Sequence, residues 1–236
     1  DFAILYRTNS QSRSFEEYML KEGIPYRIFG GLSFYQRKEI KDTLAYFRVV
    51  ANPDDEEALK RIINYPTRGI GDTTLNKIIN AATSNNVSLW SVLSQPSAYN
   101  VDLNKGTLAK LDAFRQLVGS WIERLSTDDA YTLGHAIVTE SGICKDIYSG
   151  REPEDLSRQQ NLEEFLGGMQ DFVETRKEEG LDEHISMSDY LQEVALLTDL
   201  DDGDKDSETK VSLMTVHSAK GLEFPTVFIV GLEENI

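Results

Sequence analysis

The chain has 236 residues, of which 40% are hydrophobic and 27% are charged, a composition typical of a globular protein with one large domain or two smaller ones. No apolar run approaches the roughly 20 residues that a transmembrane helix needs, and no signal-peptide pattern opens the chain, so we expect a cytoplasmic protein. The single cysteine, Cys144, excludes an internal disulfide and cannot form a zinc site by itself.

The acidic charge is concentrated in one segment. Residues 151–209 contain 19 Asp and Glu against 5 Lys and Arg, a balance of −14, which leaves −2 of the net −16 for the rest of the chain. A strongly acidic protein is an unusual nucleic-acid binder. Because the acid is local, the remaining surface can still carry basic patches that follow a phosphate backbone.

The chain opens with a strand, a helix and a second strand. Residues 2–7, FAILYR, form a short apolar run, and a helical pattern follows that includes Phe15 and Met19. Residues 26–29 form the next strand, closed by Gly30 and Gly31. Strand, helix, strand is the unit that builds a parallel sheet, so the pattern predicts an α/β fold.

Tyr6 and Arg7 are the first candidate functional residues because they stand at the C-terminal end of a strand, where parallel sheets bind ligands. An aromatic face can stack on a base, and a guanidinium can bind phosphate oxygens through two hydrogen bonds. The alternative is a packed tyrosine beside a solvated arginine.

Residues 26–42, YRIFGGLSFYQRKEIKD, combine a diglycine turn, adjacent aromatics and basic side chains. Aromatics interleaved with Lys and Arg suit single-stranded nucleic acid, since bases stack and phosphates pair with cations. Phe34 and Arg37 are the candidates here. The alternative is that Phe34 belongs to the core and that the charges solvate the start of a helix.

From residue 51 to residue 209 we expect helices only, forming a domain inserted between residues 1–50 and 210–236 of the sheet domain. The helical patterns cover residues 56–64, 73–83, 88–93, 106–125, 132–148, 156–176 and 188–197. Residues 199–210, DLDDGDKDSETK, are expected to be a solvated return linker. Their spacing does not fit a calcium-binding loop, so no metal site is predicted.

Residues 65–74, YPTRGIGDTT, place a tight turn between two predicted helices. Backbone N–H groups at the start of the second helix could bind a phosphate without reading base sequence. The alternative is a plain helix–helix turn. The candidate residues of this turn are Arg68, Gly69, Ile70, Gly71 and Thr73.

Residues 211–234 contain two apolar runs, 211–216 and 226–230, that we expect to be buried parallel strands. The loop between them carries a hydroxyl, an imidazole, an ammonium and a carboxylate. These belong to Thr215, His217, Lys220 and Glu223. Such a loop at a strand end is where ligands gather in open α/β sheets.

Four strings together resemble the UvrD-like superfamily 1 DNA helicases. TVHSAKGLEF resembles motif V of that family, AILYRTNSQSR resembles motif IV, YRIFGGLSFYQRKEIKD resembles motif IVa, and TRGIGDTT resembles the GIG element of the 2B subdomain. The resemblance implies a discontinuous RecA-like (P-loop NTPase-like) 2A domain interrupted by an all-α 2B domain. It also implies a part in ATP-dependent DNA unwinding with 3′ to 5′ movement, in repair or replication.

The resemblance also implies roles for the candidate residues. Tyr6 would stack on adenine, Arg7 would reach the γ-phosphate of ATP as the catalytic arginine, and Glu223 would bind the ribose. The single-stranded DNA contacts would come from Thr215, His217, Lys220, Phe34 and Arg37. Duplex contacts would come from Arg68, Gly69, Ile70, Gly71 and Thr73.

The sequence contains no GxxxxGK[ST] phosphate loop and no acidic magnesium-binding motif, which in such enzymes belong to a separate 1A domain. We therefore expect a fragment that requires 1A and 1B domains, ATP and Mg²⁺, and that does not hydrolyse ATP or unwind DNA alone. Two alternatives are a DNA- or protein-binding regulatory module and a RecB/AddA-type helicase–nuclease subunit.

Overall fold

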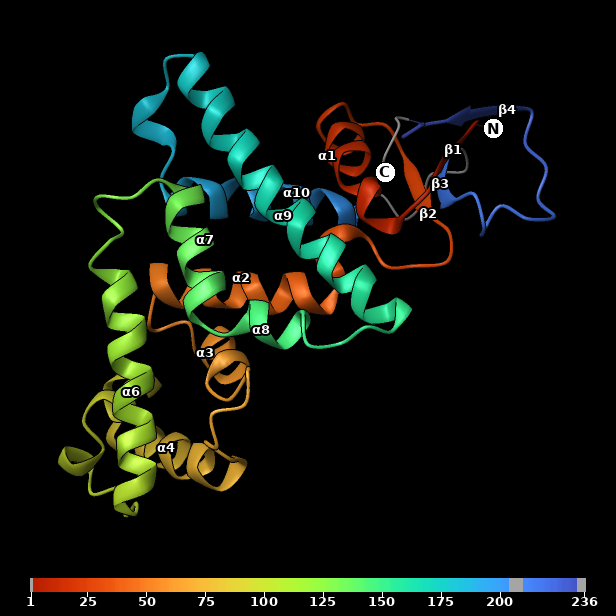
Figure 1. The fold of residues 1–236 in the computed structure, drawn as a ribbon. Helices are drawn as coiled ribbons and strands as arrows, with labels where there is room; N and C mark the ends of the chain where they lie inside the picture. The colour runs from red at the N-terminus through yellow and green to blue at the C-terminus, as the bar shows by residue number, and fades with distance from the viewer. Residues whose placement is uncertain (1, 204–209, 233–236) are drawn as a thin grey trace. The chain divides into compact units, whose positions relative to one another are not determined.

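The structure, a computed structural model, describes residues 2–203 and 210–232 (Figure 1). Its contacts divide the chain into two compact units. The first unit holds the described residues up to Lys41, Gly150–Gly168 and those from Gln192 onward, and the second holds Asp42–Ser149 and Met169–Leu191. Three helices contribute residues to both units: α2 (Lys38–Ala51), α9 (Pro153–Glu178) and α10 (Met187–Gly203).

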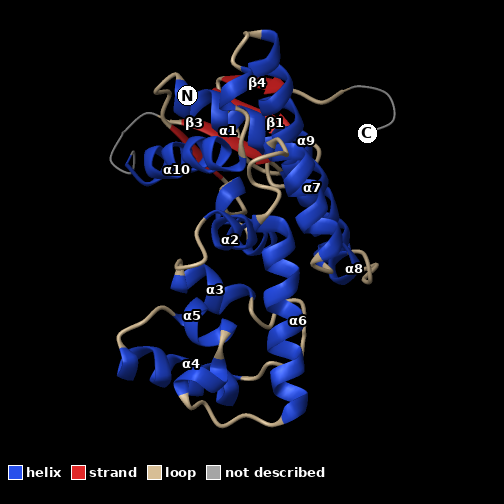
Figure 2. Cartoon of the chain, turned by 90° about the vertical axis from the view of Figure 1, so that its left-hand side faces the viewer, coloured by secondary structure: helices blue, strands red, loops and turns tan. Residues whose placement is uncertain are grey.

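The first unit contains a four-stranded parallel sheet, drawn in red in Figure 2. Its strands, in the order β2-β3-β1-β4, are β2 (Tyr26–Ile28), β3 (Val211–Thr215), β1 (Phe2–Tyr6) and β4 (Thr226–Ile229). Every neighbouring pair is parallel. The strands from the two ends of the sequence thus form one sheet, and the predicted α/β fold with a parallel sheet is confirmed.

The core of this unit forms where the first helix packs beside the central strands. Tyr6, Met19 of α1 (Ser12–Lys21) and Leu213 are buried together, and Phe15 and Ile28 pack against them. Two short 3₁₀ helices, η1 (Asn9–Gln11) and η2 (Phe34–Gln36), precede α1 and α2. Strand β1 lies between β3 and β4, and its Ala3 and Tyr6 have no exposed surface, whereas Phe2 at its start is 50% exposed.

Strand β4 differs from the expectation that both C-terminal runs are buried. It pairs with β1 at the edge of the described sheet, and Val227, Phe228 and Ile229 are 43%, 52% and 55% exposed. Only the run that forms β3 is a core strand, with Leu213 and Met214 fully buried. Apolar composition predicted the strand correctly but not its place in the sheet.

The second unit is helical. Besides parts of α2, α9 and α10, its elements are α3 (Glu56–Ile62), α4 (Asp72–Asn85), α5 (Leu89–Ser94), η3 (Pro96–Tyr99), α6 (Lys105–Ile122), α7 (Ala130–Glu140), α8 (Ile143–Ile147) and η4 (Asp182–His184). Four of these helices begin at a polar side chain that accepts a hydrogen bond from a first-turn amide, as helix starts favour. The four are Asp55, Ser88, Asn104 and Asp129.

Helix α6 shows why this unit packs. Leu111, Phe114, Val118 and Trp121 recur every three or four residues and are at least 99% buried, which is the spacing of one helical face. The indole N–H of Trp121 donates to Glu140 Oε2 at 2.7 Å. The apolar face of α6 is therefore buried, and the indole N–H on that face has a hydrogen-bond acceptor.

Two predicted segments need correction. The single helix expected over 132–148 is two helices, because Gly142 adopts φ +91° between α7 and α8. Helix α10 continues to Gly203, so the first part of the expected linker 199–210 is helical, while residues 204–209 lie outside the described residues.

Two further expectations concern the inserted segment. No strand lies between β2 and β3 in the described part of the chain, as expected. The domain boundaries at 50/51 and 209/210 stay a prediction, since the compact units are defined by contacts and cut through three helices. Among the described residues, no helix combines the length and the apolar character that crossing a membrane requires.

Candidate nucleotide and nucleic-acid sites

The C-terminal ends of β1 and β3 bring two sequence-distant segments together. The strand register pairs Tyr6 with Thr215, and the backbone N–H of Val216 donates to the carbonyl of Tyr6 at 2.9 Å. Arg7 and the loop that follows Thr215 therefore leave the sheet side by side. The sheet edge predicted to bind ligands is built from both ends of the chain.

Arg7 is exposed at this edge, and its backbone is held in place. The N–H groups of Arg7 and Thr8 both donate to the side-chain oxygen Oε1 of Gln11, at 2.9 and 3.1 Å. Sequence reasoning missed Gln11. The Thr-x-x-Gln spacing from Thr8 to Gln11 is a capping-box pattern and was the available signal.

The loop after β3 folds into consecutive turns. The hydroxyls of Thr215 and Ser218 are 2.9 Å apart, and the Ser218 N–H donates to Thr215 Oγ1 at 3.1 Å. This fold leaves His217, Lys220 and Glu223 exposed, whereas Thr215 is half-buried. The loop thus presents an imidazole, an ammonium and a carboxylate to solvent, and Thr215 serves the turn itself.

Tyr6 does not lie where base stacking requires it. Its side chain is 0% exposed and belongs to the core cluster with Met19 and Leu213. Burial, reinforced by the nearby carboxylate of Glu16, raises the pKa of Tyr6 to about 12. Because neither face of the ring is open to a ligand in this structure, stacking on adenine would require Tyr6 to leave the core, and the expected contact with adenine stays a prediction.

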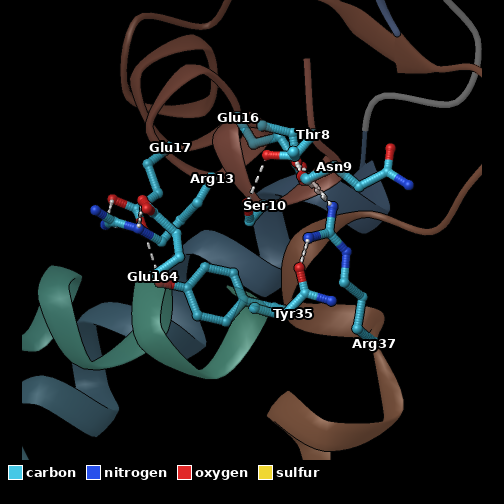
Figure 3. A network of polar contacts seen from close by, with 11 residues as sticks. Thr8, Asn9, Ser10, Arg13, Glu16, Glu17, Tyr35, Arg37 and Glu164 are labelled. Carbon is cyan, nitrogen blue, oxygen red and sulfur yellow. Dashed lines mark hydrogen bonds and ion pairs between the residues drawn. The ribbon is translucent and has the colours of Figure 1, made fainter. Parts of the chain in front are cut away.

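Phe34 and Arg37 are buried as well, and Figure 3 shows Arg37 among its polar partners. Phe34 is 0% exposed and Arg37 is 9% exposed, and the Arg37 guanidinium lies 5.0 Å from the centre of the Phe34 ring. Arg37 donates to Asn161 Oδ1 at 2.8 Å, to Ser12 Oγ at 2.8 Å and to the Asn9 carbonyl at 3.0 Å. Both side chains are used inside the protein, which favours the packing alternative over the expected single-strand contacts.

A second arginine extends this buried polar network. Arg13 binds Glu164 of α9 at 2.8 Å and Glu17 of its own helix at 3.1 Å (Figure 3). Burial alone would lower the pKa of Arg13, but the two carboxylates raise it above its ordinary value. Asn161 and Glu164 are more than 120 residues from their arginine partners in the sequence, so local pattern did not reveal this network.

Arg68 also turns inward, in the second unit. Its guanidinium donates to four backbone carbonyls, those of Ile62, Tyr65, Pro66 and Ser141, at 3.1, 2.9, 3.1 and 2.9 Å. It lies 5.3 Å from the centre of the Phe114 ring. Arg68 therefore holds the turn from inside in this structure, and its expected contact with duplex phosphate stays a prediction.

The rest of the turn is divided between buried and exposed residues. Ile70 is 1% exposed and packs in the core, whereas Gly69, Gly71 and Thr73 are exposed. Gly69 adopts φ +70°, which favours glycine, and Gly71 has an ordinary φ of −82°. Gly71 caps α4 without a side-chain hydrogen bond. The exposed residues lie at the N-terminus of α4, and the phosphate contact predicted there stays a prediction.

Two residues that shape this turn escaped sequence reasoning. Asn64 Oδ1 accepts the N–H groups of Arg68 and Ile70 at 2.9 and 3.1 Å. Lys110 of α6 donates to the Gly69 carbonyl at 3.1 Å. Asn64 lies within six residues of both amides and fits the tendency of asparagine to bond nearby backbone, but nothing local pointed to Lys110.

Metal ligands are not grouped in the described residues. No set of three or more His, Cys, Asp or Glu side chains there is placed to hold a metal ion. The expectation that the Mg²⁺ ligands lie in a separate 1A domain stays a prediction.

Comparisons with known proteins cover the whole chain. The sequence model of the family described as "UvrD-like helicase C-terminal domain" matches residues 1–236. Among curated proteins, the "ATP-dependent DNA helicase PcrA" of Staphylococcus aureus is 39% identical over 236 residues, which are all of this chain and 31% of that protein. The PcrA helicase of Staphylococcus epidermidis is also 39% identical over the same share of each chain. The chain thus spans about a third of the length of these relatives.

Proposed function

The chain belongs to the UvrD-like helicase C-terminal domain family, and on that premise we propose that it is the C-terminal part of a cytoplasmic ATP-dependent DNA helicase. Such an enzyme unwinds DNA, in repair or replication, with 3′ to 5′ movement along one strand. The observation that carries the proposal is the sheet edge where Arg7 and the 215–223 loop lie side by side. That edge offers exposed groups suited to a nucleotide and to DNA at once.

For the nucleotide we propose two contacts in this chain. Glu223 is exposed, and its carboxylate can accept hydrogen bonds from the ribose hydroxyls. Arg7 is exposed at the neighbouring strand end, and its guanidinium can stabilise charge on a transferring γ-phosphate. Tyr6 is left out because it is buried.

For single-stranded DNA we propose His217 and Lys220 as direct contacts, with Thr215 shaping the loop that carries them. Their exposed donors suit phosphate oxygens and the edges of unstacked bases. Because Glu223 is six residues beyond His217 in the same loop, a shift of this loop would change the nucleotide and DNA contacts together. Phe34 and Arg37 support the unit from inside.

For duplex DNA we propose the exposed part of the turn before α4, namely Gly69, Gly71 and Thr73. Their backbone N–H groups bind phosphate without reading sequence. Arg68 and Ile70 hold the turn from below.

The remaining parts of the proposed enzyme are outside this sequence. Phosphate-loop and magnesium-binding motifs of a 1A domain, together with a 1B domain, would complete the ATP site. Mg²⁺, when bound, neutralises charge on the β- and γ-phosphates. We accordingly propose that the chain alone neither hydrolyses ATP nor unwinds DNA.

The test uses the full-length protein and the isolated chain. The full-length protein should unwind a duplex with a 3′ single-stranded tail when ATP is present, and it should not unwind one with a 5′ tail. The isolated chain should show no DNA-stimulated ATP hydrolysis. Unwinding from a 5′ tail, or DNA-stimulated hydrolysis by the chain alone, would contradict the proposal.

A further inference from the structure

Lys110 of α6 lies against the turn proposed to contact duplex DNA. Its ammonium donates to the Gly69 carbonyl at 3.1 Å, across 41 positions of sequence. The approach is close, since a Cβ added to Gly69 would lie 2.6 Å from Lys110 Nζ. Lys110 is nevertheless exposed to solvent. The turn therefore carries a positive charge that comes from another helix.

This charge matters because the arginine of the turn is occupied. The guanidinium of Arg68 donates hydrogen bonds to four backbone carbonyls and lies over the ring of Phe114. Both terminal nitrogens of Arg68 are thus engaged by backbone carbonyls, and these nitrogens form the end-on forked contact with phosphate. The cation that a phosphate would meet at the exposed side of the turn is that of Lys110.

The contact also removes an obstacle to anion binding. A carbonyl oxygen at an exposed turn repels a phosphate, and the Gly69 carbonyl is here covered by an ammonium. An ammonium has three N–H donors, and one bond to Gly69 leaves the others for phosphate oxygens. Nearby charges on α4 are the exposed carboxylate of Asp72, which opposes an anion, and Lys77, which donates to the Asp102 carbonyl at 2.7 Å.

We propose that Lys110 is a phosphate-binding residue for duplex DNA, held against the Gly69 carbonyl so that its charge completes the binding surface of the turn. The inference rests on the proposed duplex contact at Gly69, Gly71 and Thr73 and adds a residue that no motif identified. It assigns to Lys110 the charged role that sequence reasoning gave to Arg68.

The experiment measures binding of a fluorescent blunt duplex to the 236-residue chain across a range of salt concentrations, with Lys110→Ala, Lys110→Gln and Lys110→Arg. Loss of one phosphate contact should lower the slope of log affinity against log salt by about 0.9. If the two proteins bind equally well near 1 M salt, this slope change makes the variant bind about eightfold more weakly than the wild type at 0.1 M salt. Lys177→Ala is the matched control, because Lys177 is a half-exposed lysine paired with Asp129 in the same unit.

The proposal predicts the lower slope for Lys110→Ala and Lys110→Gln, a near wild-type slope for Lys110→Arg, and no change for the control. Glutamine can still donate to the Gly69 carbonyl without charge. Full affinity and slope in Lys110→Gln would therefore mean that Lys110 only positions the turn, and would overturn the proposal. Wild-type slope in Lys110→Ala would also overturn it. If the wild-type chain binds no duplex, the proposed duplex function fails first, and the inference fails with it.

Discussion

Replacing Arg68 by alanine should destabilise the second unit without weakening the electrostatic part of DNA binding. The side chain donates to four backbone carbonyls, three of them within six residues and one at Ser141, which directly follows α7. A hydrogen bond from a charged donor contributes about 1.5–3 kcal/mol when its partner is buried, and less when water can replace it. Since Arg68 is half-buried, we expect a loss of about 3 kcal/mol in the free energy of unfolding.

The assay pairs thermal unfolding with salt-dependent duplex binding. A loss of about 3 kcal/mol lowers the melting temperature by roughly 6–12 °C in a protein of this size. Arg68→Lys is the control, because lysine keeps the charge but cannot reach four carbonyls in a planar fork. It should be nearly as unstable as the alanine variant. A stable Arg68→Ala protein whose salt slope falls by about 1 would refute the reasoning and return Arg68 to the phosphate contacts.

Three further changes test the packing account. Asp129→Ala should cost about 1 kcal/mol at pH 7, because α7 loses the side chain that accepts the Thr132 N–H. Burial would raise the pKa of Asp129, but the hydrogen bonds from Thr132 and Lys177 lower it below its usual value. The carboxylate therefore stabilises the fold above about pH 4, and this stabilisation fades as the pH falls further. Melting curves should show a smaller difference between wild type and variant at pH 3 than at pH 7. Asn161→Leu should cost about 2 kcal/mol in urea unfolding, because Arg37 loses a buried acceptor; an unchanged midpoint would contradict this. Gly69→Ala should weaken duplex binding, since φ +70° strains alanine and its Cβ displaces Lys110, and equal affinity would show that the turn tolerates both.

Short-range patterns of apolar residues in the sequence predicted much of the fold. Apolar runs and their order predicted the parallel sheet from both chain ends, and helical spacing predicted nearly every helix. The error at residues 132–148 has a local cause, because an isolated glycine inside a helical pattern is usually tolerated and Gly142 instead adopts a left-handed conformation. The exposure of β4 depends on which strands flank it, which apolar composition does not encode.

The candidate site residues likewise differ in whether local or distant contacts determine their exposure. Loop residues such as His217 and Lys220 are exposed because their loop folds on itself through bonds between near neighbours. Arg37 is assigned to single-stranded DNA because its segment interleaves aromatic and basic residues, and Arg68 to duplex DNA because its turn resembles the GIG element. In the structure each arginine also bonds a distant partner, Asn161 at 124 residues from Arg37 and Ser141 at 73 residues from Arg68. Whether an arginine faces solvent is decided by such distant contacts, and sequence pattern alone does not contain them.

The central claim is that the loop from residue 215 to residue 223 serves DNA and nucleotide through different side chains. The direct measurement is ATP hydrolysis by the full-length protein as a function of single-stranded DNA and of ATP, for Lys220→Ala and Glu223→Gln. Lys220→Ala should raise the DNA concentration for half-maximal stimulation and leave the KM for ATP unchanged at saturating DNA. Glu223→Gln should raise the KM for ATP and leave the DNA requirement unchanged. If both variants shift the same constant, or neither shifts any, the account is contradicted.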